Sequence, residues 1–253
     1  MNNSRYNLDE DVLTRNVQLA MYLRHPVGFI HKDYLEITSL DAGSVCLLAA
    51  HPAFSRSINR IIARQAGTDT FDLSEAWLRS LKCSDEHQIA FDLATSQEEL
   101  LVSTANKVAS IHLYHHLRNC VKKSRRNLIE NYIGAQAFLT SLREAPVLYP
   151  HLVEKGKEIR IDALLAGDPK AADFEGMPSP ASADDSFRDL NPVVWLGLST
   201  LFAFLKNTDS ICSSLFVLRF PKSAVSRHVT EQTMTKQQMC EVTHLLKHRG
   251  GAR

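Results

Sequence analysis

Hydrophobic residues in the central part of the chain recur at three- and four-residue steps, the spacing that places side chains on one face of an α-helix. The clearest run begins at Thr95 and passes through Ala105, Val108 and Leu117. A second run follows over residues 126–145. We expect these two segments to form a hairpin or a bent pair of helices at the centre of the core.

Helix ends are also marked in the sequence. Thr95 and Glu98 have the spacing of a capping box, in which each side chain satisfies a free backbone N–H. Pro26 and Pro52 each follow a histidine and suit the first position of a helix, which needs no backbone donor. The helix predicted from Pro52 ends at Gly67, a residue typical of C-caps. Its apolar positions are Phe54, Ile58, Ile61 and Ile62.

The second half of the chain is less regular. Residues 166–192 are rich in Pro, Gly, Ala, Ser and Asp without apolar periodicity, which predicts an exposed linker or insertion. Residues 193–205 are almost entirely apolar, but a membrane span needs about 20 such residues, so we expect a buried helix. Residues 214–221 fit a strand or a helical turn equally well. The last helix predicted carries Met234, Gln238, Val242 and Leu245 on one side.

Strand signals are scarce. The chain has 10 glycines and no Asn-Gly or Asp-Gly pair, the residues that favour tight β-hairpins. We therefore predict an all-α fold with at most one short strand or hairpin, built as a single irregular helical domain with a long loop. Its expected parts are a main body over residues 1–165, a flexible linker over 166–191, and C-terminal helices over 192–253 that pack on the body.

Composition narrows the classes of function. The net charge is +1, from 29 Lys and Arg against 28 Asp and Glu, so no chain-wide field attracts nucleic acid or an anionic membrane. The five cysteines are odd in number and form no close pair, which indicates reduced, mostly buried thiols. The polar, partly acidic N-terminus has no apolar core, so no secretory signal is expected. These features favour a cytoplasmic protein.

The stretch "HLYHHLRNCVKKSRR", residues 112–126, is the most suggestive of chemistry. His112 and His116 lie four apart and would share a metal on one helical face, with Cys120 extending the row. The glutamate of a zinc-protease H-E-x-x-H motif is absent, since Leu113 follows His112. A helix that faces the core produces the same row.

The same stretch carries Arg118, Lys122, Lys123, Arg125 and Arg126. Such a group can contact phosphates, but stacking aromatic residues are not interleaved with it. The helix dipole favours cations at a helix C-terminus, which is a sufficient structural explanation. No G-x-S-x-G elbow and no glycine-rich phosphate loop occur in the chain. We therefore expect no catalytic residues and no cofactor.

Three blocks resemble the YscK/OrgA/MxiK (SctK) family, the K subunit of the cytoplasmic sorting platform of type III secretion systems. Residues 17–36 contain an apolar stretch and a His-Pro pair. Residues 108–142 resemble the central helix pair of the family, and residues 195–221 resemble a late helix with an L-x-L-R-[LF]-P ending. The blocks cover about a third of the chain.

This resemblance implies a non-enzymatic, helical adaptor at the cytoplasmic face of the inner membrane. It would connect the cytoplasmic domain of the inner-membrane ring protein to the pod protein, which carries the stator and the ATPase. It implies no nucleic-acid partner and no membrane insertion. The basic residues between 118 and 126 would then meet an acidic partner surface. The alternatives are a helical metal-dependent enzyme using His112 and His116, and a helical regulator that binds nucleic acid.

Overall fold

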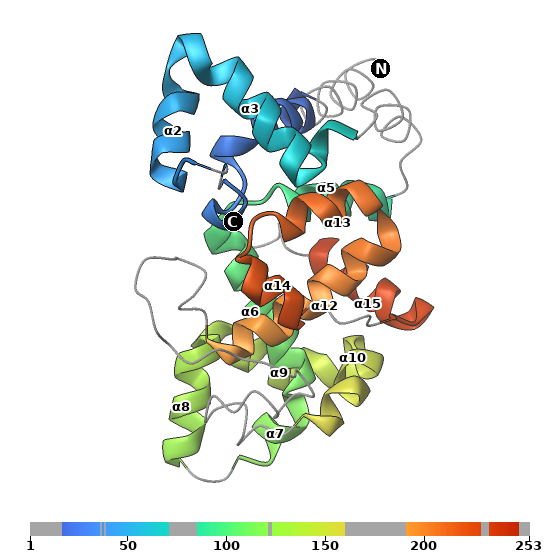
Figure 1. Ribbon diagram of the computed structural model, residues 1–253. Helices are drawn as coiled ribbons and strands as arrows, with labels where there is room; N and C mark the ends of the chain where they lie inside the picture. The colour runs from blue at the N-terminus through green and yellow to red at the C-terminus, as the bar shows by residue number, and fades with distance from the viewer. Residues whose placement is uncertain are drawn as a thin grey trace, which may run out of the picture. The chain divides into compact units, whose positions relative to one another are not determined.

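The computed structural model describes residues 17–35, 37, 39–70, 85–120, 123–159, 191–228 and 233–247. Within these ranges all regular elements are helices, which confirms the all-α prediction (Figure 1). The described residues also contain one isolated antiparallel β-bridge, between Ile37 and Leu40. Residues 214–221 form the end of a helix and a turn, so the alternative of a strand is wrong.

The chain divides into two compact units, and their boundaries differ from those predicted at residues 165 and 191. Unit 1 contains residues 1–94 and 211–222, and unit 2 contains residues 95–210 and 223–253. Both predicted helical regions therefore contribute to each unit. The predicted linker, 166–191, lies outside the described residues except for Asn191.

Unit 1 is built from short helices and one longer helix of 15 residues. Residues 17–24 are helical, and the 3₁₀ turns η1 (Pro26–Gly28) and η2 (Lys32–Tyr34) follow. Then come α2 (Ala42–Ala50), α3 (Pro52–Ala66), η3 (Thr68–Thr70), α5 (Asp85–Ala94) and α13 (Ser210–Val217). Its main hydrophobic cluster is formed by Ile30, Leu35, Val45, Ile58, Ile62 and Leu218.

The ends of α3 follow the sequence prediction. Pro52 occupies the first turn, and Gly67 ends the helix with φ 71°, a left-handed conformation that glycine adopts without steric cost. The N-cap is His51, whose Nδ1 accepts a hydrogen bond of 3.3 Å from the Ala53 backbone N–H. By contrast, Pro26 begins only a single 3₁₀ turn.

The apolar stripe predicted on α3 is only half buried. Ile58 and Ile62 belong to the core, whereas Phe54 is 50% exposed and Ile61 is 41% exposed. The hydrophobic spacing therefore predicted the helix correctly, but it did not predict which of its apolar residues are buried in the core.

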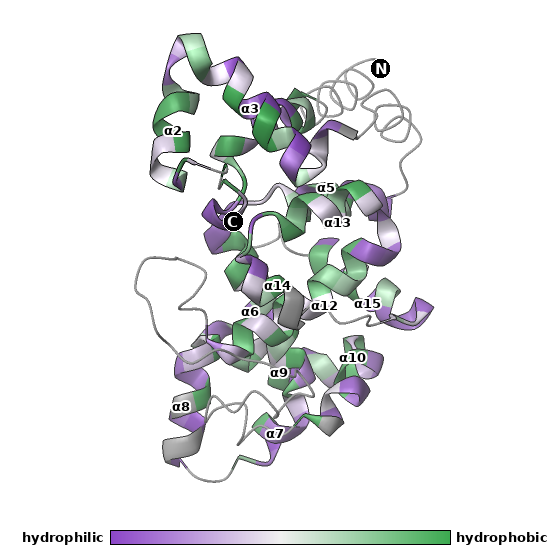
Figure 2. Cartoon of the chain, viewed as in Figure 1, coloured by the Kyte–Doolittle hydropathy of each residue, from purple (hydrophilic) through white to green (hydrophobic). Residues whose placement is uncertain are grey.

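Unit 2 contains helices of very different lengths, from single turns to the 17 residues of α12. They are α6 (Glu98–His112), α7 (Tyr114–Arg118), α8 (Lys123–Ile133), α9 (Ala135–Leu148), α10 (Pro150–Lys155), η4 (Gly156–Glu158), α12 (Pro192–Thr208), α14 (Lys222–His228) and α15 (Lys236–Lys247). All residues from Val193 to Leu205 are buried, which confirms the predicted buried helix. Figure 2 shows the resulting contrast between the hydrophobic α12 and the more polar α8. No helix among the described residues is long and apolar enough to cross a membrane.

Two glycines allow backbones to approach closely in unit 2. A Cβ atom at Gly197 of α12 would lie 1.9 Å from the carbonyl oxygen of Ala105 in α6. A Cβ atom at Gly156 would lie 1.8 Å from the carbonyl oxygen of His112. Neither position accepts a side chain without moving a backbone, because real Cβ contacts are never so short.

Several details of the predicted central helices are wrong. The N-cap of α6 is Gln97, so Thr95 does not cap this helix. The first predicted run is interrupted at Leu113, and the second is interrupted at Gly134, whose φ is 84°. Of the described cysteines only Cys212 is buried, which contradicts the expectation of mostly buried thiols.

Candidate partner interface

The basic residues of the stretch 112–126 lie on two helices. Arg118 is the last residue of α7 and Lys123 is the first residue of α8, and both are exposed. Arg126 is also exposed, and its guanidinium lies 5.0 Å from the centre of the Phe138 ring. Lys122 and the side chain of Arg125 are outside the described residues.

This placement changes the electrostatic explanation of the cluster. Arg118 lies at the C-terminal end of a helix, where the dipole favours a cation. Lys123, Arg125 and Arg126 instead lie at the start of α8, whose first turn contains no acidic residue. The positive end of the helix dipole disfavours cations there. The helix dipole therefore explains only the position of Arg118. As an explanation of Lys123, Arg125 and Arg126 it is wrong.

His112, one half of the candidate metal pair, is a buried structural residue. Its Nδ1 lies 2.8 Å from the Leu152 carbonyl oxygen, and its Nε2 lies 2.9 Å from the Thr200 hydroxyl. Since a carbonyl only accepts, Nδ1–H donates to Leu152 and the Thr200 hydroxyl donates to Nε2. Both ring nitrogens are thus used inside the protein.

Burial also controls the charge of this histidine. It lowers the pKa of His112 to about 4, and repulsion by the nearby Lys155 ammonium acts in the same direction. The hydrogen bond to the Leu152 carbonyl opposes this effect but does not reverse it. The imidazole is therefore neutral near pH 7 and bridges α6, α10 and α12.

His116 does not continue the helix on which His112 lies. α6 ends at His112, and Leu113 separates it from α7, which contains His116. The described residues include no group of three or more His, Cys, Asp or Glu side chains that would hold a metal ion. The four-residue spacing therefore does not bring this pair together as a metal site, because the lone pair of His112 already accepts from Thr200.

Glu241 is a buried polar residue that the sequence did not reveal. Its carboxylate accepts hydrogen bonds of 2.9 Å from the backbone N–H groups of His151 and Leu152, and Oε1 lies 2.7 Å from His151 Nδ1. Leu152 is thus bound through its N–H to α15 and through its carbonyl to His112 of α6. Partners 40 to 90 residues apart leave no local signal of these contacts.

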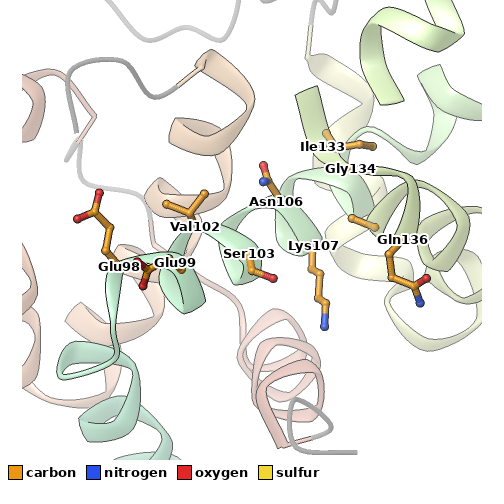
Figure 3. Close-up of a pocket in the computed structure, with 10 residues that line it drawn as sticks. Glu98, Glu99, Val102, Ser103, Asn106, Lys107, Ile133, Gly134 and Gln136 are labelled. Atoms are coloured by element: carbon orange, nitrogen blue, oxygen red, sulfur yellow. The ribbon is translucent and has the colours of Figure 1, made fainter. Parts of the chain in front are cut away.

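A groove of about 850 Å³ runs along α6 in the same unit. Figure 3 shows Glu98, Glu99 and Lys107 on α6, together with Ile133 and Gln136 from the region where α8 meets α9. Its charged lining residues are two glutamates and one lysine, so the groove does not gather cations as the stretch 118–126 does.

Comparisons with known proteins leave the chain without a match. No family model, no curated protein and no solved structure matches it. The candidate interface is therefore defined by its residues alone: Arg118, Lys123 and Arg126 as exposed cations, with Lys122 and Arg125 between them in sequence.

Proposed function

We propose that the chain is a non-enzymatic adaptor of a type III secretion sorting platform, linking the cytoplasmic domain of the inner-membrane ring protein to the pod protein. The order and content of the three resembling blocks carry this proposal. Most of their described residues are helical: residues 17–24 with η1 and η2 in unit 1, parts of α6 to α9 in unit 2, and α12 to α13. Such a helical body agrees with the fold that the resemblance implies.

The exposed cations support a role in binding. Arg118, Lys123 and Arg126 are accessible, and the helix dipole opposes the last two. Lys123 is therefore placed for contacts outside α8, whereas Arg126 also packs its guanidinium over the Phe138 ring of α9. We assign these residues, with Lys122 and Arg125, to an acidic surface of one platform partner.

Co-purification tests this function. The tagged chain is expected to retain the cytoplasmic domain of the ring protein and the pod protein when each is offered alone, and to retain both when they are offered together. Retention of neither partner, or displacement of one by the other, contradicts the bridging role.

Surface variants test whether the two contacts are separable. Replacing Lys122, Lys123, Arg125 and Arg126 by Glu is expected to abolish retention of one partner and to spare the other. The matched control reverses four exposed cations elsewhere in unit 2 and so changes the net charge equally: Arg143, Lys206, Lys236 and Lys247. If every disruptive variant loses both partners together, the proposal of two separate interfaces is wrong.

A further inference from the structure

A second pocket, in unit 1, gathers arginines that are far apart in the sequence. It has a volume of about 850 Å³, within the range of ligand sites. Its basic lining comes from Arg24, at the end of the first described helix, and from Arg56 and Arg60 of α3, with the imidazole of His25 beside them. Arg56 and Arg60 are four residues apart and share one face of α3.

These arginines have no carboxylate partner in the part of the chain that the structure describes. No ion pair involves Arg24, Arg56 or Arg60 there. Among the described residues of the lining, Asp69 is the one acidic residue, and its Oδ2 lies 3.8 Å from Nε of Arg64. In this part of the structure, three guanidinium groups thus line a concavity whose described carboxylate already has a cation beside it.

The remaining lining suits a ligand that is partly apolar. Leu23, Pro52 and Ala63 contribute apolar surface between the charged groups. Pro52 is at the first position of α3, a helix of 15 residues, so the positive end of its dipole faces the same region. Met21, three residues before Arg24, is 58% exposed and extends the apolar surface beyond the pocket.

We propose that this pocket, defined here as the arginine pocket by Arg24, His25, Arg56 and Arg60, binds an acidic segment of a partner protein. Aspartate and glutamate side chains would accept hydrogen bonds from the guanidinium groups, which match carboxylates in geometry. Apolar side chains of the same segment would cover Leu23 and Met21. This proposal rests on the proposed adaptor function in one respect: that the ligand with the carboxylate groups is a protein.

The openness of the site favours a peptide over a small anion. The three arginines and His25 are exposed, and the adjoining Met21 offers apolar contact outside the pocket. A small phosphate ligand would use the charges but would leave Met21 uncovered. A longer segment uses both features, which is the charge and shape complementarity typical of protein interfaces.

The test is a titration of the full chain with a short fluorescein-labelled peptide made of Asp, Glu and Leu, followed by fluorescence anisotropy. The same peptide with Asn and Gln in place of Asp and Glu is the ligand control. We expect saturable binding of the acidic peptide that weakens as salt rises, and no binding of the amide peptide. Equal binding of both peptides overturns the proposal.

Charge reversal locates the binding site. The double variant Arg56→Glu and Arg60→Glu is expected to raise the Kd of the acidic peptide about tenfold, given the typical strength of exposed ion pairs. The control reverses Arg143 and Lys236 of unit 2 and changes the net charge equally. Its Kd is expected to stay within about twofold of wild type. An equal loss in both variants shows unspecific charge attraction and overturns the proposal.

Two further measurements complete the test. Arg24→Glu, on a different element, is expected to raise the Kd as well, so the result does not depend on the folding of one α3 variant. Competition with inorganic triphosphate distinguishes a small-anion site: if triphosphate binds at the arginines and the acidic peptide does not, the pocket serves another ligand.

Co-purification of both platform partners with unchanged peptide binding in the α3 variant would refute the pocket and leave the adaptor function standing. Peptide binding at the pocket without retention of either platform partner would refute the adaptor function instead.

Discussion

The two units use their polar side chains differently. In unit 2, His112 and Glu241 are buried and bind backbone groups of α10. In unit 1, Arg24, Arg56 and Arg60 line an open pocket and have no ion-pair partner among the described residues. The comparison separates residues that hold the fold together from residues available to a ligand. Substitutions in unit 2 should therefore change stability, and substitutions in the arginine pocket should change binding.

The largest effect is expected where α6 and α12 meet. Gly197→Ala places a Cβ atom 1.9 Å from the Ala105 carbonyl oxygen. The backbones must separate, so we expect a loss of about 3 kcal/mol in the free energy of unfolding. Urea denaturation measures this loss. Gly28→Ala in unit 1 is the control, since no atom lies within 4 Å of its added Cβ, and an unchanged midpoint is expected.

The next effect concerns His112 and pH. Its pKa is about 4 in the folded protein against 6.5 in an ordinary setting, so the unfolded chain binds more protons between these values. Stability from this group is complete above pH 6.5 and is lost as pH falls toward 4, by about 3 kcal/mol in total. Denaturation curves at several pH values should show this slope in the wild type.

His112→Gln removes the titration and should flatten that part of the pH profile. It is also expected to lower stability at pH 7 by about 2 kcal/mol, because the hydrogen bonds to Leu152 and Thr200 are not both replaced. A variant that keeps the wild-type slope would show that another group titrates in this window.

A loss similar to that of His112→Gln is expected at the C-terminal helix. Glu241→Ala leaves the backbone N–H groups of His151 and Leu152 without their acceptor. We expect the free energy of unfolding to fall by about 2 kcal/mol. Glu241→Gln keeps one side-chain oxygen and should recover part of the loss. If the alanine variant is as stable as wild type, α15 does not hold α10 in solution.

The arginine pocket should behave in the opposite way. The double variant Arg56→Glu and Arg60→Glu removes no ion pair to another described side chain, so its stability is expected to stay within about 0.5 kcal/mol of wild type. Thermal unfolding monitored by circular dichroism tests this. A large loss of stability would mean that these arginines belong to the fold, and the contrast between the units would disappear.

The smallest effect is expected at the start of α8. Lys123→Glu replaces a cation by an anion at the positive end of the helix dipole, and should raise stability by about 0.3–0.5 kcal/mol. The change Arg118→Glu, at the end of α7, is the reverse comparison and should lower it slightly. Opposite signs in the two variants, measured by urea denaturation, would confirm that the basic cluster spans two helix ends of opposite polarity.

Local sequence determined the fold class and several helix ends. Pro52 and Gly67 act through their own backbone preferences, so α3 was predictable without its neighbours. Asn191 likewise caps α12, because its side chain accepts a hydrogen bond of 3.0 Å from the Val194 N–H. The continuous apolar run from Val193 required burial wherever it was placed.

Tertiary structure alone decided the candidate sites. His112 and His116 shared a pattern that fits a metal pair, but Leu152 and Thr200, distant in sequence, engage both nitrogens of His112. The cations at 118–126 form a cluster that is visible in the sequence. Arg24 and Arg56 are far apart in the sequence, so no cluster indicates their pocket. These arginines line one pocket because the folded chain brings the helix of residues 17–24 and α3 together. Patterns along the chain report preferences of the local backbone, while the partners of a side chain depend on contacts that only the packed structure creates.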